Sequence, residues 1–273
     1  IILYNQKKNN SIKMISNKKF SLKKYKTGIV IQARTASKRF PKKILSRING
    51  KTILEIMIER LIAYFNQEDI YIATTKESRD NAILKIAKNK KINIFRGSEN
   101  NVLSRFKKCA EKNNLNQVIR LTSDCPLIDP QLIIRLFKIQ LNKKFDYSGN
   151  CFPYDKRTFP VGSDIEFINL NFLKKISRKS LDNYEKEHIT PYLNKKKFKT
   201  YLFNSKTNNS KLRYTLDYKE DLIVLKKIMS HLTTKKIFGT TNQIINFLKN
   251  NKNIIKLNSK HVANYYIKKL NQL

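Results

Sequence analysis

Short apolar runs alternate with amphipathic segments through the middle of the chain, and this rhythm constrains the fold more than any other feature. The runs with the length of buried strands lie at residues 28–32, 69–74, 92–95 and 117–121. The segments with helical spacing lie at residues 52–65, 78–89, 101–112 and 130–141. This alternation predicts a three-layer α/β fold, in which a mostly parallel sheet is covered by helices on both faces. Right-handed crossovers then place the loops after the strands at one edge, facing one crevice.

The rhythm breaks between residues 145 and 170, where two prolines and a glycine fall within residues 152–162. A substrate pocket is usually built at an interruption of this kind. Later strands are predicted at residues 163–168, 199–203 and 212–215, and a helix at 218–231. The first 26 residues hold eight lysines and no acidic residue, which indicates a mobile tail. The predicted organisation is a basic tail over residues 1–26, a main domain over 27–232 and a helical appendage over 233–273.

The composition bounds the class of protein. Lysine and arginine number 57 against 20 acidic residues, which gives a formal net charge of +37. A dedicated nucleic-acid binder concentrates such charge on one face, whereas these lysines are spread over every segment. Three cysteines without a C-x-x-C pair argue for a reducing compartment and against a disulfide framework. No apolar run approaches the ~18 residues of a membrane span. We therefore expect a cytoplasmic protein with no membrane span and no specific nucleic-acid partner.

The first candidate for chemistry is the loop after the run at residues 28–32. It carries five lysine or arginine side chains between residues 34 and 43, and the Thr52-Ile-Leu-Glu55 capping box of the next helix follows it. Strand, basic loop and helix together place backbone donors and cations where they can hold a phosphate. A solvated basic turn explains the same spacing equally well. Ser98 could contact a nucleoside, but a plain strand-to-helix turn is the alternative. The loop's candidates for binding a triphosphate are Arg34, Ser37, Arg39 and Lys43.

Two aspartates are candidates for holding a metal ion. Asp124 directly follows the run at 117–121, so it is expected at the same sheet edge as the basic loop. Asp217 comes two residues after the predicted strand at 212–215. Mg²⁺ prefers one or two carboxylates together with substrate phosphates. A capping role is the alternative for both residues, and their positions alone leave it open.

Three stretches resemble one family of enzymes. Ile31-Gln-Ala-Arg-Thr-Ala-Ser-Lys-Arg-Phe-Pro-Lys-Lys-Ile-Leu45 is similar to the signature loop of the cytidylyltransferases that activate acidic sugars. The closest group is the spore-coat-polysaccharide (SpsF-like) one, related to the acylneuraminate and 3-deoxy-manno-octulosonate cytidylyltransferases. Arg120-Leu-Thr-Ser-Asp124 and Leu212-Arg-Tyr-Thr-Leu-Asp217 resemble the second and third motifs, in the family's order. The family usually has glycine where this chain has Ala36, Lys42 and Ser123, and threonine and proline where it has Tyr218 and Lys219.

The resemblance implies a nucleotide-diphospho-sugar transferase-like (Rossmann-like) fold over roughly residues 27–260. It assigns Mg²⁺ to Asp124 and Asp217, and it implies that backbone around Ala33 and Arg34 reads a cytosine base. Two more stretches, at residues 159–166 and 187–192, resemble the family's sugar-side segments. They make Asp164, Glu166 and His188 substrate-binding candidates, with a structural role as the alternative for His188. Arg157, on the preceding loop, is the candidate partner for a sugar carboxylate.

The resulting hypothesis is a Mg²⁺-dependent enzyme that transfers CMP from CTP to an acidic sugar and releases pyrophosphate, for surface polysaccharide or glycan biosynthesis. Arg34, Arg39 and Lys43 would stabilise the charge that develops on the phosphates. A nucleotide-sugar-dependent glycosyltransferase is the enzymatic alternative, but its expected Asp-x-Asp motif is missing, since Thr122-Ser-Asp124 is not one. A basic nucleic-acid-binding module is the alternative from another class. A homodimer is compatible with the resemblance.

Overall fold

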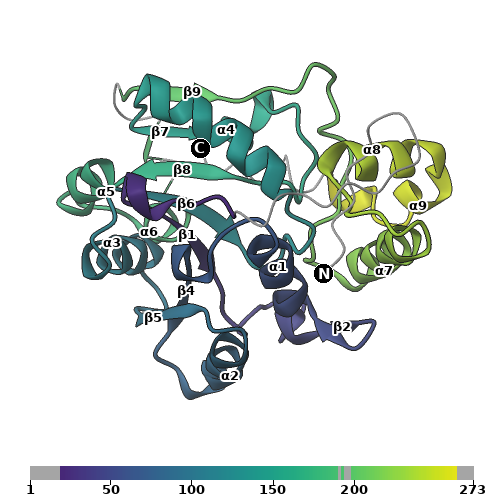
Figure 1. Cartoon of the computed structure of the whole chain (residues 1–273), viewed down its shortest axis with the longest axis horizontal. Coiled ribbons are helices and arrows are strands. Elements are labelled where there is room, and N and C mark those ends of the chain that lie inside the picture. Colours follow the sequence, from purple (N-terminus) through teal and green to yellow (C-terminus); the bar gives the residue numbers. More distant parts are fainter. Residues whose placement is uncertain (1–18, 190–191, 194–197, 263–273) are drawn as a thin grey trace.

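A seven-stranded sheet forms the centre of the molecule. The computed structural model describes residues 19–189, 192–193 and 198–262. The strands occur in the order β5-β4-β1-β6-β8-β7-β9 (Figure 1). Their bounds are β1 (Thr27–Gln32), β4 (Ile70–Thr75), β5 (Asn93–Gly97), β6 (Gln117–Thr122), β7 (Tyr147–Gly149), β8 (Glu166–Asn169) and β9 (Thr200–Leu202). Only β8 runs antiparallel to its neighbours within this sheet. The predicted mostly parallel sheet is confirmed.

Helices cover both faces of the sheet, as the alternating sequence predicts. They are α1 (Ile53–Ile62), α2 (Asn81–Asn89), α3 (Val102–Lys112), α4 (Pro130–Lys143), α5 (Leu170–Ser177) and α6 (Asn183–His188). The first hydrophobic cluster joins one sheet face to α1, α2 and α4, and the second joins the other face to α3, α5 and the region of α6. The predicted three-layer α/β architecture is therefore confirmed. A short hairpin of β2 (Arg47–Ile48) and β3 (Lys51–Thr52) precedes α1.

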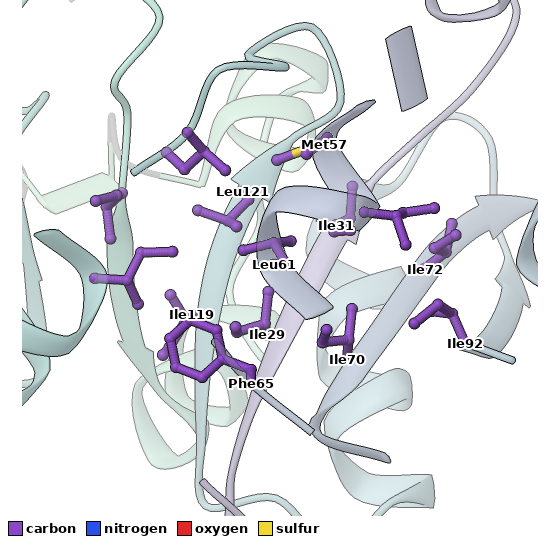
Figure 2. Packing of buried hydrophobic residues seen from close by; sticks show 14 of the residues in the cluster. Ile29, Ile31, Met57, Leu61, Phe65, Ile70, Ile72, Ile92, Ile119 and Leu121 are labelled. Atoms are coloured by element: carbon purple, nitrogen blue, oxygen red, sulfur yellow. The ribbon is translucent and has the colours of Figure 1, made fainter. Parts of the chain in front are cut away.

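The alternation of side chains along β1 supplies both cores. Ile29 and Ile31 are fully buried against Met57, Leu61 and Phe65 on one face (Figure 2). Val30 between them is buried in the cluster on the opposite face. A parallel strand buried on both sides needs a continuous apolar run, and this explains why residues 28–32 carry no alternation of polar and apolar side chains.

The predicted capping box fixes the start of α1. The Glu55 backbone N–H donates to Thr52 Oγ1 at 3.2 Å, and the Thr52 backbone N–H donates to Glu55 Oε2 at 2.8 Å. These two bonds satisfy donors that the first helical turn leaves unpaired. The helix therefore begins directly after the short hairpin that follows the basic loop.

The expectation of a mobile tail over residues 1–26 is wrong for residues 19–26, whereas residues 1–18 lie outside the described part of the chain. The Phe20 N–H donates to the Tyr64 carbonyl at 2.8 Å, and the Leu22 N–H donates to Asp69 Oδ2 at 2.8 Å. Leu22 is fully buried, and the Phe20 ring packs edge-on against Phe65. The segment leads directly into β1, so it belongs to the folded unit.

The C-terminal helices pack against the rest of the domain and do not form a separate appendage. They are α7 (Lys219–Thr234), α8 (Thr241–Asn250) and α9 (Lys252–Lys256), which share a third hydrophobic cluster with residues of α1 (Figure 1). Arg60 on α1 donates to the Phe238 carbonyl at 2.6 Å and to the Gly239 carbonyl at 2.7 Å. Asp129 Oδ2 accepts from the Thr241 N–H at 2.8 Å. The domain boundary at 232/233 stays a prediction, but the packing continues across it.

The predicted strand at residues 212–215 does not form. Only Arg213 makes an isolated parallel bridge, with Val161. The backbone of this segment bonds with Val161 in the loop at 152–162 and not with a strand of the sheet, so it has no ladder to join. A membrane-crossing helix would need a longer apolar stretch than any helix in the described ranges provides.

Candidate active site

The loops at the carboxyl ends of β1, β5 and β6 surround a cavity of about 1110 Å³. Its walls come from the basic loop after β1, the turn after β5, the Asp124 turn after β6 and the segment that precedes α7. This is the sheet edge at which the crossover argument places the ligand site.

The basic loop is held in shape by its own backbone and by a buried carboxylate. The Thr35 N–H and its Oγ1 hydroxyl both donate to Asp80 Oδ1, each at 2.7 Å. The Lys42 N–H donates to the Thr35 carbonyl at 3.0 Å, which closes the loop. Lys42 adopts a left-handed conformation, with φ of +55°. A left-handed position favours glycine. The glycine that related loops carry here therefore has a conformational reason, whereas in this chain a lysine adopts the same conformation.

A cluster of opposite charges lies on the floor of the cavity. Lys43 Nζ lies between two carboxylates, donating to Asp124 Oδ2 at 2.7 Å and to Asp217 Oδ1 at 2.8 Å. Arg39 Nη2 donates to the same Asp217 oxygen at 2.6 Å. Burial alone would lower the pKa of the Lys43 ammonium, but the two carboxylates outweigh it and raise that pKa above its ordinary value. The chain thus holds a positive charge between Asp124 and Asp217.

Arg213 was not among the sequence candidates, although it binds the Asp217 oxygen to which neither Lys43 nor Arg39 donates. Arg213 Nη2 donates to Asp217 Oδ2 at 3.0 Å, and its guanidinium forks onto Asp221 at 2.9 and 2.8 Å. Asn258 donates to Asp221 Oδ1 at 2.8 Å. Burial would raise the pKa of Asp217, yet Lys43, Arg39 and Arg213 together hold that pKa well below its ordinary value. Asp217 is therefore an ionised carboxylate with a fixed orientation.

A second group of ion pairs lines the side of the cavity formed by β6, β8 and the region of α6. Arg120 pairs with Glu166, whose other oxygen accepts from the Tyr147 hydroxyl at 2.9 Å. Arg120 Nη2 also donates to Gln32 Oε1 at 2.9 Å. Arg34 Nη2 donates to Glu187 Oε1 at 2.6 Å, and both side chains are partly exposed. Neither Arg120 nor Glu187 was among the sequence candidates, although both lie within stretches that resemble the family.

The structure brings most of the predicted site residues to the cavity wall. Those that line it are Arg34, Ser37, Arg39, Lys43, Asp124, Asp164, Glu166 and Asp217. Ala33 and Ser98 lie outside the lining, Ala33 being 1% exposed and the Ser98 Oγ accepting from the Asn101 N–H at 3.1 Å. The side chain of His188 lies outside the described part of the structure.

Arg157 does not face the cavity in this structure. Its side chain is fully buried, and Nη2 donates to Asp164 Oδ1 at 2.7 Å and to the Pro160 carbonyl at 2.6 Å. Its role toward a sugar carboxylate therefore stays a prediction that these contacts do not support. Cys125 lines the cavity but is 3% exposed, and burial raises the pKa of its thiol well above the ordinary value. A protonated, buried thiol is a poor nucleophile.

A mostly parallel sheet with a cationic loop and paired carboxylates at its carboxyl edge defines an α/β fold of the nucleotidyltransferase type. The sequence model of one family, described as cytidylyltransferase, matches residues 28–254. The chain belongs to the cytidylyltransferase family, and its predicted nucleotide-diphospho-sugar transferase-like fold is confirmed.

The chain is also similar to individual proteins over most of its length. A cytidylyltransferase structure from Leptospira borgpetersenii is 37% identical and superposes with a TM-score of 0.79 over 84% of this chain and 96% of that one. An uncharacterised protein of Methanocaldococcus jannaschii is 32% identical over 84% of this chain and 93% of its own length. The spore coat polysaccharide biosynthesis protein SpsF of Bacillus subtilis is 32% identical over 60% of this chain and 68% of its own length.

Proposed function

We propose that the protein transfers CMP from CTP to a sugar hydroxyl and releases pyrophosphate. The observation that carries the proposal is the ammonium of Lys43 between Asp124 and Asp217, with Arg39 on the same carboxylate. Two carboxylates that hold a cation beside a phosphate-binding loop are the parts that phosphoryl chemistry of this type needs. Family membership supports a nucleotidyltransferase over the nucleic-acid-binding alternative.

In the proposed reaction, a sugar hydroxyl oxygen attacks the α-phosphorus of CTP. The bond from that phosphorus to the bridging oxygen breaks, pyrophosphate leaves with the electron pair, and the hydroxyl proton passes to solvent. Arg34 and Arg39 are 31% and 43% exposed in their side chains, so both can reach a triphosphate. Their forked guanidinium groups and the Lys43 ammonium would orient the phosphates and stabilise the growing negative charge.

The donor set fits Mg²⁺. Asp124 and Asp217 face one position that already holds a positive charge, and neither residue needs a third carboxylate, because substrate phosphates complete the shell of Mg²⁺. When Lys43 and Arg39 bind phosphate oxygens instead, Asp217 Oδ1 loses its two donors and becomes available to a metal ion. Arg213 still donates to Asp217 Oδ2 and keeps the carboxylate in place. Bound between the two aspartates, the ion would neutralise phosphate oxygens as the leaving group departs.

The acceptor is proposed to be an acidic sugar, on the strength of the sequence resemblance. Because Arg157 is turned onto Asp164, the cations of the β6 and α6 wall that face the cavity are Arg120 and Arg34. A sugar carboxylate would compete with Glu166 or Glu187 for one of these guanidinium groups. Activation of a surface polysaccharide precursor, a cytoplasmic location and a homodimer remain predictions of this proposal.

Pyrophosphate release tests the proposal directly. The purified chain is incubated with Mg²⁺, each of the four nucleoside triphosphates and a panel of acidic and neutral sugars. We expect release with CTP that requires a sugar acceptor, and loss of that release on chelation of the metal. Release with no acceptor, or equal release with all four nucleotides, would overturn the assignment. Asp124→Asn serves as the inactive reference.

A further inference from the structure

A segment beyond the family match reaches into the site. The match ends at residue 254, yet two side chains after that point contact the catalytic region. Asn258 donates to Asp221 and to the Arg213 carbonyl, at 2.8 and 3.3 Å. His261, three residues further on, lines the cavity together with Arg39 and Tyr218. The family features therefore do not explain this part of the wall.

The His261 ring is fixed by stacking. Its plane lies 4° from that of Tyr218, with ring centroids 3.8 Å apart, and the residue is only 8% exposed. The Arg39 guanidinium lies 5.2 Å from the centroid of the same Tyr218 ring. Tyr218 stands where the family usually carries threonine, so this chain has an aromatic platform next to Asp217. The platform places His261 on the phosphate-binding side of the cavity.

The imidazole of His261 has no hydrogen-bond partner among the described residues. Nε2 is within ion-pair distance of Glu220 Oε2, at 3.4 Å, and that carboxylate also pairs with Lys260 through its other oxygen at 2.7 Å. Nδ1 has no such contact among the described residues. A buried polar group without a partner costs free energy comparable to a lost hydrogen bond. The structure therefore keeps one ring nitrogen, Nδ1, without a partner among the described residues, at the wall of a cavity that the side chains of Arg39 and Lys43 also line.

We propose that His261 is a substrate-binding residue that donates a ring N–H to a phosphate oxygen at the pyrophosphate end of the nucleotide. The proposal rests on the proposed function for the identity of the substrate. A neutral imidazole has one N–H donor, and an oxyanion among Arg39, Lys43 and Arg213 is the acceptor that this environment favours. The pyrophosphate product carries the same oxygens, so it must use the same contact.

Calorimetric titration of the full chain with inorganic pyrophosphate and Mg²⁺ tests this contact without any turnover. His261→Phe keeps a ring on Tyr218 but removes the donor, and we expect binding weaker by about 10-fold, with a similar rise in the KM for CTP. His261→Gln keeps an amide donor and should retain most of the affinity. His231 stacks on Phe247 away from the cavity, at 4.2 Å, so His231→Phe is the matched control and should bind as the wild type does.

A wild-type measurement covers the case in which the His261 variants fail to fold. Ring nitrogen resonances of His261 should shift when pyrophosphate is added, whereas those of His231 should not. Unchanged pyrophosphate affinity in folded His261→Phe, or an unshifted His261 ring, overturns the inference. The failure of this inference is distinguishable from that of the proposed function. If His261→Phe still transfers CMP from CTP with an unchanged KM, only the role of His261 is wrong.

Discussion

At the scale of single residues, the site depends on how one carboxylate is shared. Asp217 accepts from Lys43 and Arg39 through Oδ1 and from Arg213 through Oδ2. Arg213 is in turn held by Asp221, so it cannot follow a ligand. Among the described residues, the side chains of Lys43 and Arg39 hydrogen-bond only to the two aspartates of the cavity floor. We infer that the oxygen facing the cavity changes partners on binding while the other oxygen stays fixed.

Asp217→Asn should lower the rate of CTP-dependent pyrophosphate release by ~10²–10³-fold, because a preorganised charge of the site is removed. The amide retains the shape of the carboxylate, and the fold should survive. Asp155→Asn is the control, because it changes an exposed carboxylate that is not among the lining residues, although its neighbour Tyr154 is. Steady-state rates of the two variants decide the matter, and a rate for Asp217→Asn within a few-fold of the control would contradict the metal assignment.

The same carboxylate should make stability depend on pH. The folded pKa of Asp217 lies below its ordinary value, so the stability it contributes is present above that value and is lost as the pH falls through the folded pKa. We expect Asp217→Asn to melt below the wild type near pH 6, and the difference in Tm to shrink below about pH 4. Melting curves across this range measure it. A Tm difference that stays constant with pH would show that packing, not charge, causes the loss.

At the scale of elements, the sequence predicts features whose interacting residues are close together in the chain, but not contacts between residues that are far apart in it. The Thr52 and Glu55 box predicts the start of α1 because its partners are three residues apart. Arg213 is only four positions from Asp217, but the groups that hold it in place come from further away. Asp221 lies 8 positions away, and Asn258, which donates to the Arg213 carbonyl, lies 45 positions away. The segment at 212–215 has strand-like composition but no neighbouring strand, and composition cannot supply one.

The N-terminal segment shows the same limit. Lysines dominate it, and the two apolar residues that anchor it, Phe20 and Leu22, are too few to show a period. Leu22→Ala should lower the free energy of unfolding by about 2–4 kcal/mol, because a fully buried side chain is removed from the core. Lys24→Ala, on an exposed neighbour, should change it by less than about 0.5 kcal/mol. Urea unfolding measures the free energy of unfolding of both variants. Equal values for the two would show that the segment is not packed on the core and is a tail, as the sequence predicts.

At the scale of the whole molecule, the question is which of the 57 basic residues act in the site. The charges lining the cavity floor are individually paired, whereas Lys249 and Lys252 are exposed on α8 and α9 and lie outside the lining. A diffuse positive field would act on any anion and would fade with salt. A positioned ammonium acts on one phosphate at short range and is worth more in a site that excludes water.

Lys43→Gln compared with the double change Lys249→Gln and Lys252→Gln separates these two cases. Lys43 has an 11% exposed side chain between Asp124 and Asp217, so its removal should lower kcat and kcat/KM together, by an amount equivalent to ~2–4 kcal/mol. The double variant removes twice the formal charge and should leave both constants unchanged within error. Steady-state kinetics with CTP at two salt concentrations would show it. If kcat/KM falls as much in the double variant as in Lys43→Gln, and both losses disappear in high salt, the effect comes from the total positive charge of the protein. The basic loop would then have no special role.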